Sequence, residues 1–340
     1  MQSDSLSAAA RAAAAAAGAY VGDALAMPAH WFYDQAELER TFGTLDEYRD
    51  PPQHHPGSIL WRSRYEPSEP EFDILGSARS YWGRRGVHYH QFLRAGENTL
   101  NLKLLRLVLD MVDEIGGYDR GEFISRYRRF MLDPDGHRDT YVEECHRGYF
   151  ENVRRGIDPG RCAVSEKHIG GMVAVVPLYA ALVARGVSSE RAAETVQDHV
   201  SVTHAGSMVA DAVRTLVTVG EEILAGEGLE EALRAHLRRQ DLPFLQGPIE
   251  RAARRDVRQV LGRVYSTACY LDESMPAVFY LALRYPDSPQ EGLVANTMAG
   301  GDNCHRGAVL GALYGLAGAD FPQHWVSGLR PDDAVSRKSQ

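Results

Sequence analysis

The stretch AGGDNCHRGAVLGALYGLAGA, residues 299–319, joins two different kinds of sequence. Its first nine residues place an acid, an amide, a thiol, an imidazole and a guanidinium among three glycines. The rest is a run of small and apolar residues, which is typical of a buried helix. Asp302 follows two glycines and precedes this run, so it is a candidate N-cap. The stretch therefore predicts a group of polar side chains at the start of a buried helix.

Apolar residues recur at helical spacing through most of the chain. In residues 100–115 they form one stripe that ends before Gly116. The same pattern predicts further helices at 119–133, 188–200, 207–226, 228–239, 248–265, 274–285 and 288–300. Ser188 or Ser189 would cap the helix at 188–200. Since no segment alternates as a strand does, the sequence predicts an all-α fold, a compact multi-helix bundle.

The first residues are rich in alanine and need a separate interpretation. Residues 5–28 contain an arginine and no leucine-rich core, so we expect a first helix capped by Ser5 or Ser7 instead of a signal peptide. The apolar run at 172–184 is too short to cross a bilayer. We expect one domain over residues 1–325 and a flexible tail over residues 326–340.

Residues 46–90 are the exception to the helical pattern. Five prolines interrupt this segment, so it cannot form a regular helix. Its tryptophans favour an ordered loop, because disordered segments contain few aromatic residues. We expect a long irregular loop that covers a site. His88 and His90 in this segment offer two ligands, which are too few for a metal site.

Charge and cysteine content exclude some classes of function. The formal net charge is −9, which argues against a nucleic-acid-binding protein. No segment suggests a membrane partner. The four cysteines form no CxxC pair, so we expect reduced thiols and a cytoplasmic protein.

Four stretches of the chain, in this order, carry a resemblance to a known family. They are GAYVGDALAMPAHWFYD (18–34), RAGENTLNLKLL (94–105), SVTHAGSMVADA (201–212) and the segment 268–319, which begins with ACYLDESMP and ends with GALYGLAGA. Together they resemble the ADP-ribosylglycohydrolase family, which includes the dinitrogenase-reductase-activating glycohydrolases. The resemblance covers about residues 15–320 and implies that family's all-α, orthogonal multi-helix fold. It also implies a hydrolase that cleaves an N- or O-glycosidic bond to ADP-ribose or a related nucleotide-sugar.

The resemblance implies partners and cofactors as well. The partner would be ADP-ribose, or a protein or small molecule that carries it. Two Mg²⁺ ions would be held by a Thr-Asp-Asp triplet that opens an early helix and by an Asp-x-Asp-Thr motif that opens the last one. Here the first motif falls on Gly96, Glu97 and Asn98, and the second on residues 302–305. We therefore expect Glu97, Asn98 and Asp302 to bind one Mg²⁺ ion, a softer divalent metal, or no metal.

Further site residues follow from the same motifs. His30 stands where the family has a glutamate, so we expect it to act with Glu97, Asp302 and Cys304 in catalysis. We expect the following residues to contact the ligand: Asp23, Gly170, Gly171, His204, Gly301 and His305. Cys304 lies in the first helical turn, where the dipole favours a thiolate, although buried cysteines are usually inert. Two alternatives remain open: a protein that binds ADP-ribose without hydrolysis, and thiol chemistry at Cys304.

Overall fold

The computed structural model describes residues 6–67, 69–238 and 249–330, and this part of the chain is almost entirely helical. The two strands are two residues long, β1 (Val164–Ser165) and β2 (His204–Ala205), and they pair in parallel. The all-α prediction is therefore confirmed. In the described residues no helix is both long and apolar enough to cross a membrane.

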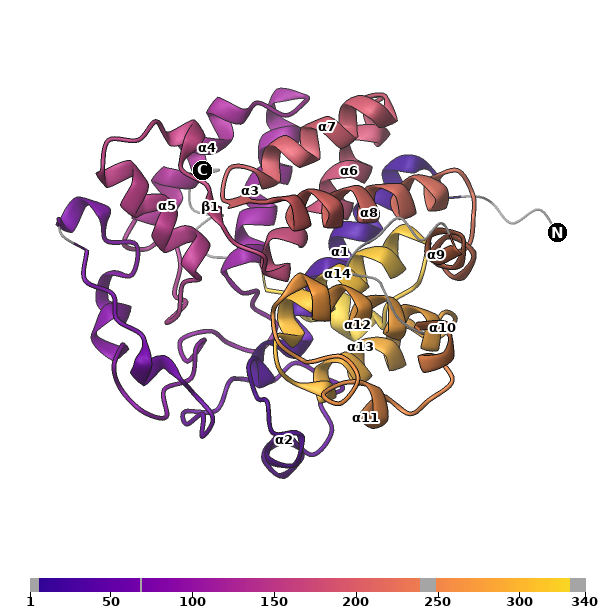
Figure 1. Cartoon of the computed structure of the whole chain (residues 1–340), viewed down its shortest axis with the longest axis horizontal. Coiled ribbons are helices and arrows are strands. Elements are labelled where there is room, and N and C mark those ends of the chain that lie inside the picture. Colours follow the sequence, from indigo (N-terminus) through magenta and orange to yellow (C-terminus); the bar gives the residue numbers. More distant parts are fainter. Residues whose placement is uncertain (1–5, 68, 239–248, 331–340) are drawn as a thin grey trace.

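Two helices from opposite ends of the chain form the centre of the fold (Figure 1). They are α1 (Ala8–Ala26) and α14 (Asn303–Leu316), and they cross in direct backbone contact. A Cβ atom built on Gly311 would lie 2.0 Å from the Gly18 carbonyl oxygen, and one on Gly22 would lie 2.1 Å from the Gly307 carbonyl oxygen. Glycines four residues apart on each helix thus create the contact, because residues four apart lie on one face.

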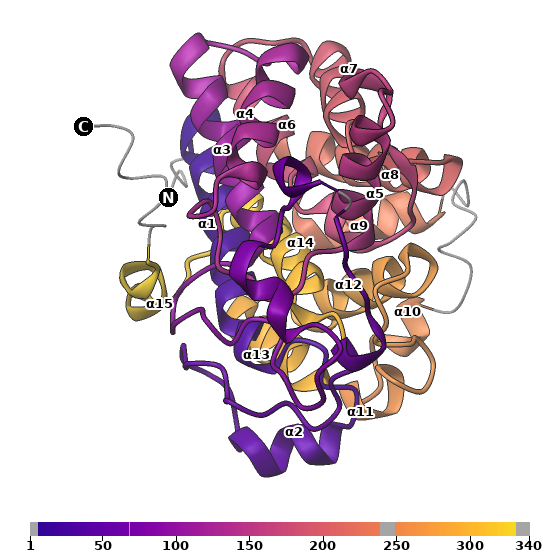
Figure 2. The ribbon, with the colours of Figure 1, turned by 90° about the vertical axis from the view of Figure 1, so that its left-hand side faces the viewer.

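The other helices surround this pair (Figures 1 and 2). Toward one end lie α3 (Leu100–Ile115), α4 (Arg120–Leu132), α5 (Glu144–Arg154), α6 (Val175–Ala184), α7 (Ser189–Val200) and α8 (Ser207–Leu224). The remaining helices are α2 (Gln35–Phe42), α9 (Leu229–Arg238), α10 (Ile249–Ala252), α11 (Val257–Val260), α12 (Leu271–Arg284), α13 (Pro289–Ala299) and α15 (Gln323–Gly328). Helices α6, α12 and α13 pack directly on the central pair.

Local sequence signals placed several of these helices correctly. Ser7 caps α1, with its side chain accepting from the Ala10 amide, and Ser188 caps α7 in the same way. The prediction of one helix over 248–265 is wrong. Asp256 accepts a hydrogen bond from the Arg258 amide and so begins a new short helix, α11. The sequence analysis also did not predict α5.

The segment 46–90 contains no α-helix or strand among its described residues. It contains three 3₁₀ turns, η2 (Leu60–Arg62), η3 (Pro70–Phe72) and η4 (Gly76–Tyr81). Two of its histidines bind the backbone that follows α1: His55 donates to the His30 carbonyl and His88 donates to the Pro28 carbonyl. These contacts hold the loop against residues 28–30.

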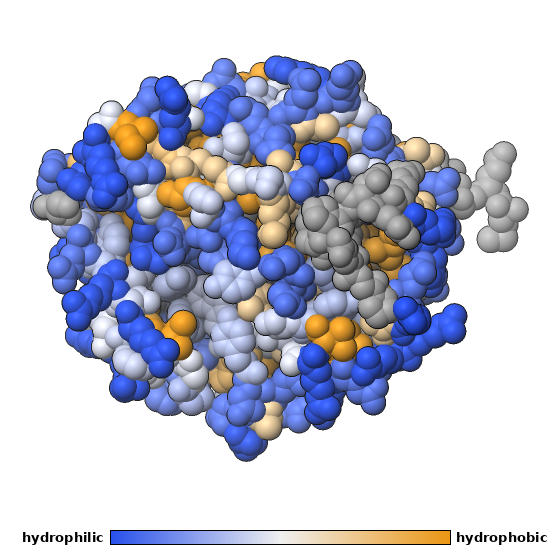
Figure 3. Space-filling view, viewed as in Figure 1, coloured by the Kyte–Doolittle hydropathy of each residue, from blue (hydrophilic) through white to orange (hydrophobic). Residues whose placement is uncertain are grey.

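The C-terminal part of the described chain packs on this same loop. Trp325 is fully buried, and its indole donates to the Asp46 carbonyl at 2.8 Å. The described structure thus continues beyond residue 325 to residue 330, and the rest of the predicted tail lies outside the described residues. The face drawn in Figure 3 is mostly hydrophilic, with apolar residues scattered in small groups.

Candidate active site

A tight turn between α13 and α14 builds the start of the site. Gly300 and Gly301 both have positive φ, which a residue with a side chain rarely adopts. The Trp31 amide donates to the Gly301 carbonyl, and the Gly301 amide donates to the Phe32 carbonyl. A Cβ atom on Gly301 would lie 2.0 Å from the Thr267 carbonyl oxygen, so close backbone packing requires glycine at this position. Gly301 is one of the predicted ligand contacts.

A buried arginine fixes the same turn. Arg306 is fully buried in α14, and its guanidinium donates to Asn296 Oδ1 at 2.7 Å and to the Gly300 carbonyl at 2.8 Å. Burial lowers the pKa of Arg306 to about 10, so the side chain stays charged at neutral pH. This contact ties the end of α13 to the start of α14.

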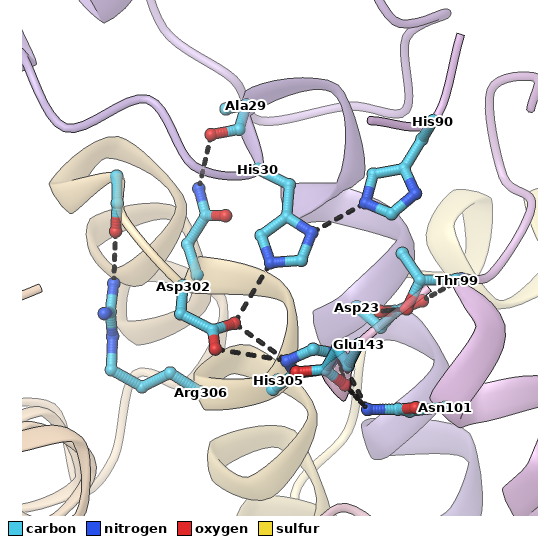
Figure 4. A network of polar contacts seen from close by, with 12 residues as sticks. Asp23, Ala29, His30, His90, Thr99, Asn101, Glu143, Asp302, His305 and Arg306 are labelled. Carbon is cyan, nitrogen blue, oxygen red and sulfur yellow. Dashed lines mark hydrogen bonds and ion pairs between the residues drawn. The ribbon is translucent and has the colours of Figure 1, made fainter. Parts of the chain in front are cut away.

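Two histidines converge on the carboxylate that the turn presents (Figure 4). His30 Nε2 lies 3.0 Å and His305 Nδ1 lies 2.9 Å from Asp302 Oδ1. All three side chains are buried. His305 follows Asp302 by three residues on α14, which places both on one helix face. His30 comes from the 3₁₀ turn η1 (Met27–Ala29) after α1.

Burial and charge shift these three groups in different directions. Burial alone would lower the pKa of His305, but Asp302, Glu143 and Asp23 raise it to about 10. Burial lowers the pKa of His30 to about 3, more than its contact with Asp302 raises it. Against the effect of burial, His305 and His30 hold the pKa of Asp302 well below its usual range. The site therefore favours a positive charge beside an ionised Asp302.

A chain of buried side chains leads from His30 into the protein. His30 Nδ1 lies 2.7 Å from His90 Nε2, and His90 Nδ1 lies 2.9 Å from Asp139 Oδ1. Lys103 of α3 donates to the other oxygen of Asp139 at 3.3 Å. Against burial, Lys103 and His90 hold the pKa of Asp139 below its usual range. His90 was not predicted as a site residue, because 60 residues separate it from His30 and no local pattern links the two.

On the other side of His305 lies a second group that the sequence analysis missed. Glu143, at the N-cap of α5, has Oε2 3.9 Å from His305 Nε2. The side-chain amide of Asn101 joins this group, with contacts of 2.5 Å to Glu143 Oε2 and 3.1 Å to His305 Nε2. His146 Nε2 lies 3.0 Å from Asn101 Oδ1. Glu143 follows no recognisable motif, so nothing in the sequence could have identified it.

Of these groups, Glu143 lines a cleft whose walls are aromatic rings. The cleft has a volume of about 120 Å³, and its lining includes Trp31, Tyr33, Tyr89, Tyr141 and Glu143. The Trp31 ring stacks on His30 with centroids 3.9 Å apart. Trp31 has φ +62°, an uncommon conformation for a large residue and one that costs energy. The strained backbone therefore directs a large aromatic ring to the wall of the cleft.

The two predicted metal ligands in the stretch 94–105, Glu97 and Asn98, contact different partners. Glu97 forms an ion pair with the partly exposed Arg138 and accepts from the Arg94 amide. Asn98 donates to Asp23 Oδ2 at 2.9 Å. None of the contacts found among the described residues joins Glu97 or Asn98 to Asp302. The predicted metal set of Glu97, Asn98 and Asp302 thus has no common centre that these contacts support.

Asp23 fixes the start of α3. Its two oxygens accept from the Thr99 amide at 2.8 Å and from the Thr99 hydroxyl at 2.6 Å, so Thr99 is held at the N-cap of α3. Burial raises the pKa of Asp23. Glu97 and Asn98 therefore precede the helix, and Asn101, in its first turn, is the side chain that reaches His305.

Gly170 and Gly171, two of the predicted ligand contacts, lie beside Asn101 and His204. A Cβ atom on Gly170 would lie 2.6 Å from Asn101 Nδ2, and one on Gly171 would lie 2.9 Å from the His204 ring. These three predicted residues line a second, smaller cavity of about 50 Å³. His204 Nε2 is buried and has no hydrogen-bond partner in the structure. Their role in ligand binding stays a prediction.

Cys304 does not have the environment of a reactive thiol. It is fully buried in a small apolar cluster with Ala26, Met27 and Leu93. Burial raises the pKa of Cys304 well above its usual value, and this outweighs the helix dipole. The structure therefore argues against the hypothesis of thiol chemistry at Cys304.

The donors around Asp302 do not fit Mg²⁺. Mg²⁺ demands oxygen ligands in near-octahedral geometry. Among the His, Cys, Asp and Glu side chains of the described residues, those that converge with Asp302 within 4.8 Å are His30 and His305, which offer nitrogens. Glu97, the carboxylate of the first motif, pairs with Arg138 instead, and Cys304 of the second motif has no side-chain oxygen. These donors therefore do not form an octahedral oxygen site for Mg²⁺.

Comparison with known proteins identifies the family. A family model described as ADP-ribosylglycohydrolase matches residues 4–338. An uncharacterized protein of Archaeoglobus fulgidus is 27% identical over 244 residues, which are 70% of this chain and 77% of that protein. A solved structure titled "ADP-ribosylglycohydrolase-related protein complex" has a TM-score of 0.57 at 19% identity, covering 98% of this chain and 100% of that one. That likeness supports the fold, and the family match shows that this chain belongs to the ADP-ribosylglycohydrolase family.

Proposed function

We propose that this protein hydrolyses an N- or O-glycosidic bond to ADP-ribose or to a related nucleotide-sugar. The observation that carries the proposal is the placement of two carboxylates, Asp302 and Glu143, on either side of His305, with Glu143 lining an aromatic cleft. Glycoside hydrolysis commonly uses two carboxyl groups, one to protonate the leaving group and one to act on water or the anomeric carbon. Family membership supports the same class of bond.

Glu143 is our candidate for the group that transfers the proton to the leaving group. It lines the cleft and is mostly buried, and Asn101 fixes one of its oxygens. His30, which the sequence suggested for this role as an alternative to a carboxylate, has both ring nitrogens in contact with other side chains. We therefore assign His30 to holding Asp302 in place. Water would add to the anomeric carbon as the bond to the leaving group breaks, and Asp302 would accept the proton of that water.

The cleft accounts for part of the ligand. Its volume of about 120 Å³ is close to that of a cavity that holds one benzene ring, about 150 Å³. One ring of the substrate would thus lie against Trp31 and Tyr141, where aromatic stacking favours a sugar or a planar base. The remainder of a nucleotide-sugar would extend from this cleft.

The first experiment is calorimetric titration of ADP-ribose into the protein, followed by hydrolysis assays on ADP-ribosylated arginine and serine. We expect binding, and a turnover that Glu143→Gln reduces 100-fold or more, since loss of a general acid typically costs that much. Glu190→Gln makes the same change at an exposed glutamate of α7 and should leave turnover unchanged. Binding without turnover would favour the binding-protein alternative, and neither binding nor turnover would overturn both.

A further inference from the structure

We propose that His30, Asp302 and His305 bind one divalent transition-metal ion, such as Zn²⁺ or Fe²⁺, in place of the Mg²⁺ that the family resemblance implied. Two imidazoles and one carboxylate form a donor set that suits these metals, whereas Mg²⁺ prefers oxygen alone. The ion would lie in the site of the proposed function, on which its part in the reaction rests. Its binding can be measured without any substrate.

The spacing of the three ligand atoms fits a single ion. His30 Nε2 and His305 Nδ1 lie 3.0 Å and 2.9 Å from Asp302 Oδ1, and all three atoms lie within 4.8 Å of one another. Two ligands that each lie about 2.1 Å from one ion are about 3 Å apart when they meet it at a right angle. His30 directly follows η1, Asp302 and His305 lie at the start of α14, and all three side chains are buried.

The hydrogen bonds that link His30 to His90 and Asp139 indicate that a cation is needed between His30 and Asp302. A carboxylate oxygen of Asp139 accepts from His90 Nδ1–H, and a His90 ring with no proton on Nε2 accepts there from His30 Nδ1–H. A neutral His30 is thereby left with a lone pair on Nε2, 3.0 Å from an Asp302 oxygen. Two acceptors this close repel one another unless a cation lies beside both. Metal-binding histidines are commonly held in this way, by donating their other N–H to an acceptor.

The contacts behind His305 allow the same arrangement. Its Nε2 lies 3.1 Å from the side-chain amide of Asn101, whose oxygen and nitrogen are exchanged by a half-turn. With the amide oxygen toward His305, Nε2–H donates to Asn101, and Nδ1 is free to bind an ion beside Asp302. The 2.5 Å contact between Asn101 and Glu143 then holds a proton on Glu143, as its acid role requires. One metal ion accounts for both nitrogens at Asp302, whereas without an ion two protons are needed, one on His305 Nδ1 and one more shared by His30 and His90.

The test is to strip the full-length protein with EDTA and to titrate it with Co²⁺ and Zn²⁺, following visible absorption and heat. We expect one equivalent of Co²⁺ to bind with ligand-field bands, and a hundredfold excess of Mg²⁺ not to displace it. His30→Ala and His305→Ala should each abolish the bands. His90→Gln should keep the three ligands and weaken Co²⁺ binding about 10- to 100-fold, because His90 only positions His30.

Controls make each outcome decisive. His199→Gln changes a buried histidine of α7 outside the site and should bind Co²⁺ normally. If His30→Ala fails to fold, as judged by circular dichroism, His305→Gln and His90→Gln still test the proposal. Absence of saturable Co²⁺ binding, equal binding in the site variants, or displacement by Mg²⁺ would each overturn it. Finding by ¹⁵N NMR that His30 and His90 share three ring protons in the presence of Zn²⁺ would show that a proton supplies the charge instead.

The two proposals fail separately. Metal binding without hydrolysis of any ADP-ribose conjugate would refute the proposed function and leave the metal site in place. Hydrolysis that continues unchanged after EDTA treatment, in a protein that binds no Co²⁺, would refute the metal site and leave the proposed function in place.

Discussion

Substituting alanine for Gly311 tests the contact that places the site. In the native structure a Cβ atom at this position would lie 2.0 Å from the Gly18 carbonyl oxygen and 2.7 Å from its carbonyl carbon. Ordinary contacts of a Cβ atom begin at 3.4 Å. Both groups belong to helix backbones, so no flexible side chain can move aside. Helices α1 and α14 must therefore separate at the centre of the core.

The cost can be worked from two opposing effects. Overpacking a core costs about 1–3 kcal/mol, and a clash between two backbones belongs at the upper end. Replacing glycine by alanine inside a helix returns about 1 kcal/mol of helix propensity. We therefore expect Gly311→Ala to lower the free energy of unfolding by about 2 kcal/mol. Equilibrium unfolding in urea, followed by circular dichroism, measures this difference.

Gly220→Ala is the matched control. Gly220 is also a buried helical glycine, in α8, but a Cβ atom there would meet nothing closer than 3.4 Å. We expect it to leave the free energy of unfolding unchanged or to raise it by up to about 1 kcal/mol. If Gly311→Ala proves as stable as Gly220→Ala, the close backbone contact between α1 and α14 is not a determinant of the fold.

Three further predictions concern the loop, the cleft and the thiol. Burial lowers the pKa of His55 to about 4 and that of His88 well below 6.5, so the unfolded chain takes up protons first. The free energy of unfolding should then fall as the pH drops below about 6.5, by up to about 1.4 kcal/mol per pH unit for each histidine. Urea midpoints at pH 7.5 and 5.0 measure this, and His55→Gln should reduce the drop; an equal drop would contradict the assignment. Trp31→Ala should weaken ADP-ribose binding at least tenfold by calorimetry, and unchanged affinity would place the ligand elsewhere. Iodoacetamide at pH 8 should modify Cys304 more slowly than the half-buried Cys269 in the native protein, and faster labelling of Cys304 would revive the thiol hypothesis.

How much of the site the sequence could predict depends on the range of the contacts involved. The position of Asp302 at a helix start could be predicted because its signals are local: two glycines, an acid and the helix that they precede. Its role in the site rested on the family resemblance. The structure places Asp302 at the N-cap of α14, where its carboxylate contacts histidines instead of capping the helix. Glu97 and Asn98 lie just before the start of α3. That start is set by Asp23, which binds Thr99 from 76 residues away.

The sequence by itself determined the helical class, the main helix boundaries and the position of the α14 turn, because periodicity, capping residues and glycines act within a few positions of each other. Only the tertiary structure decided that His90, Asn101 and Glu143 join His30 and His305. These residues come from the irregular loop, from α3 and from the start of α5, and no residue near any of them specifies its distant partner. Their meeting depends on how α1 and α14 cross, since that crossing brings the segment after α1 to the start of α14.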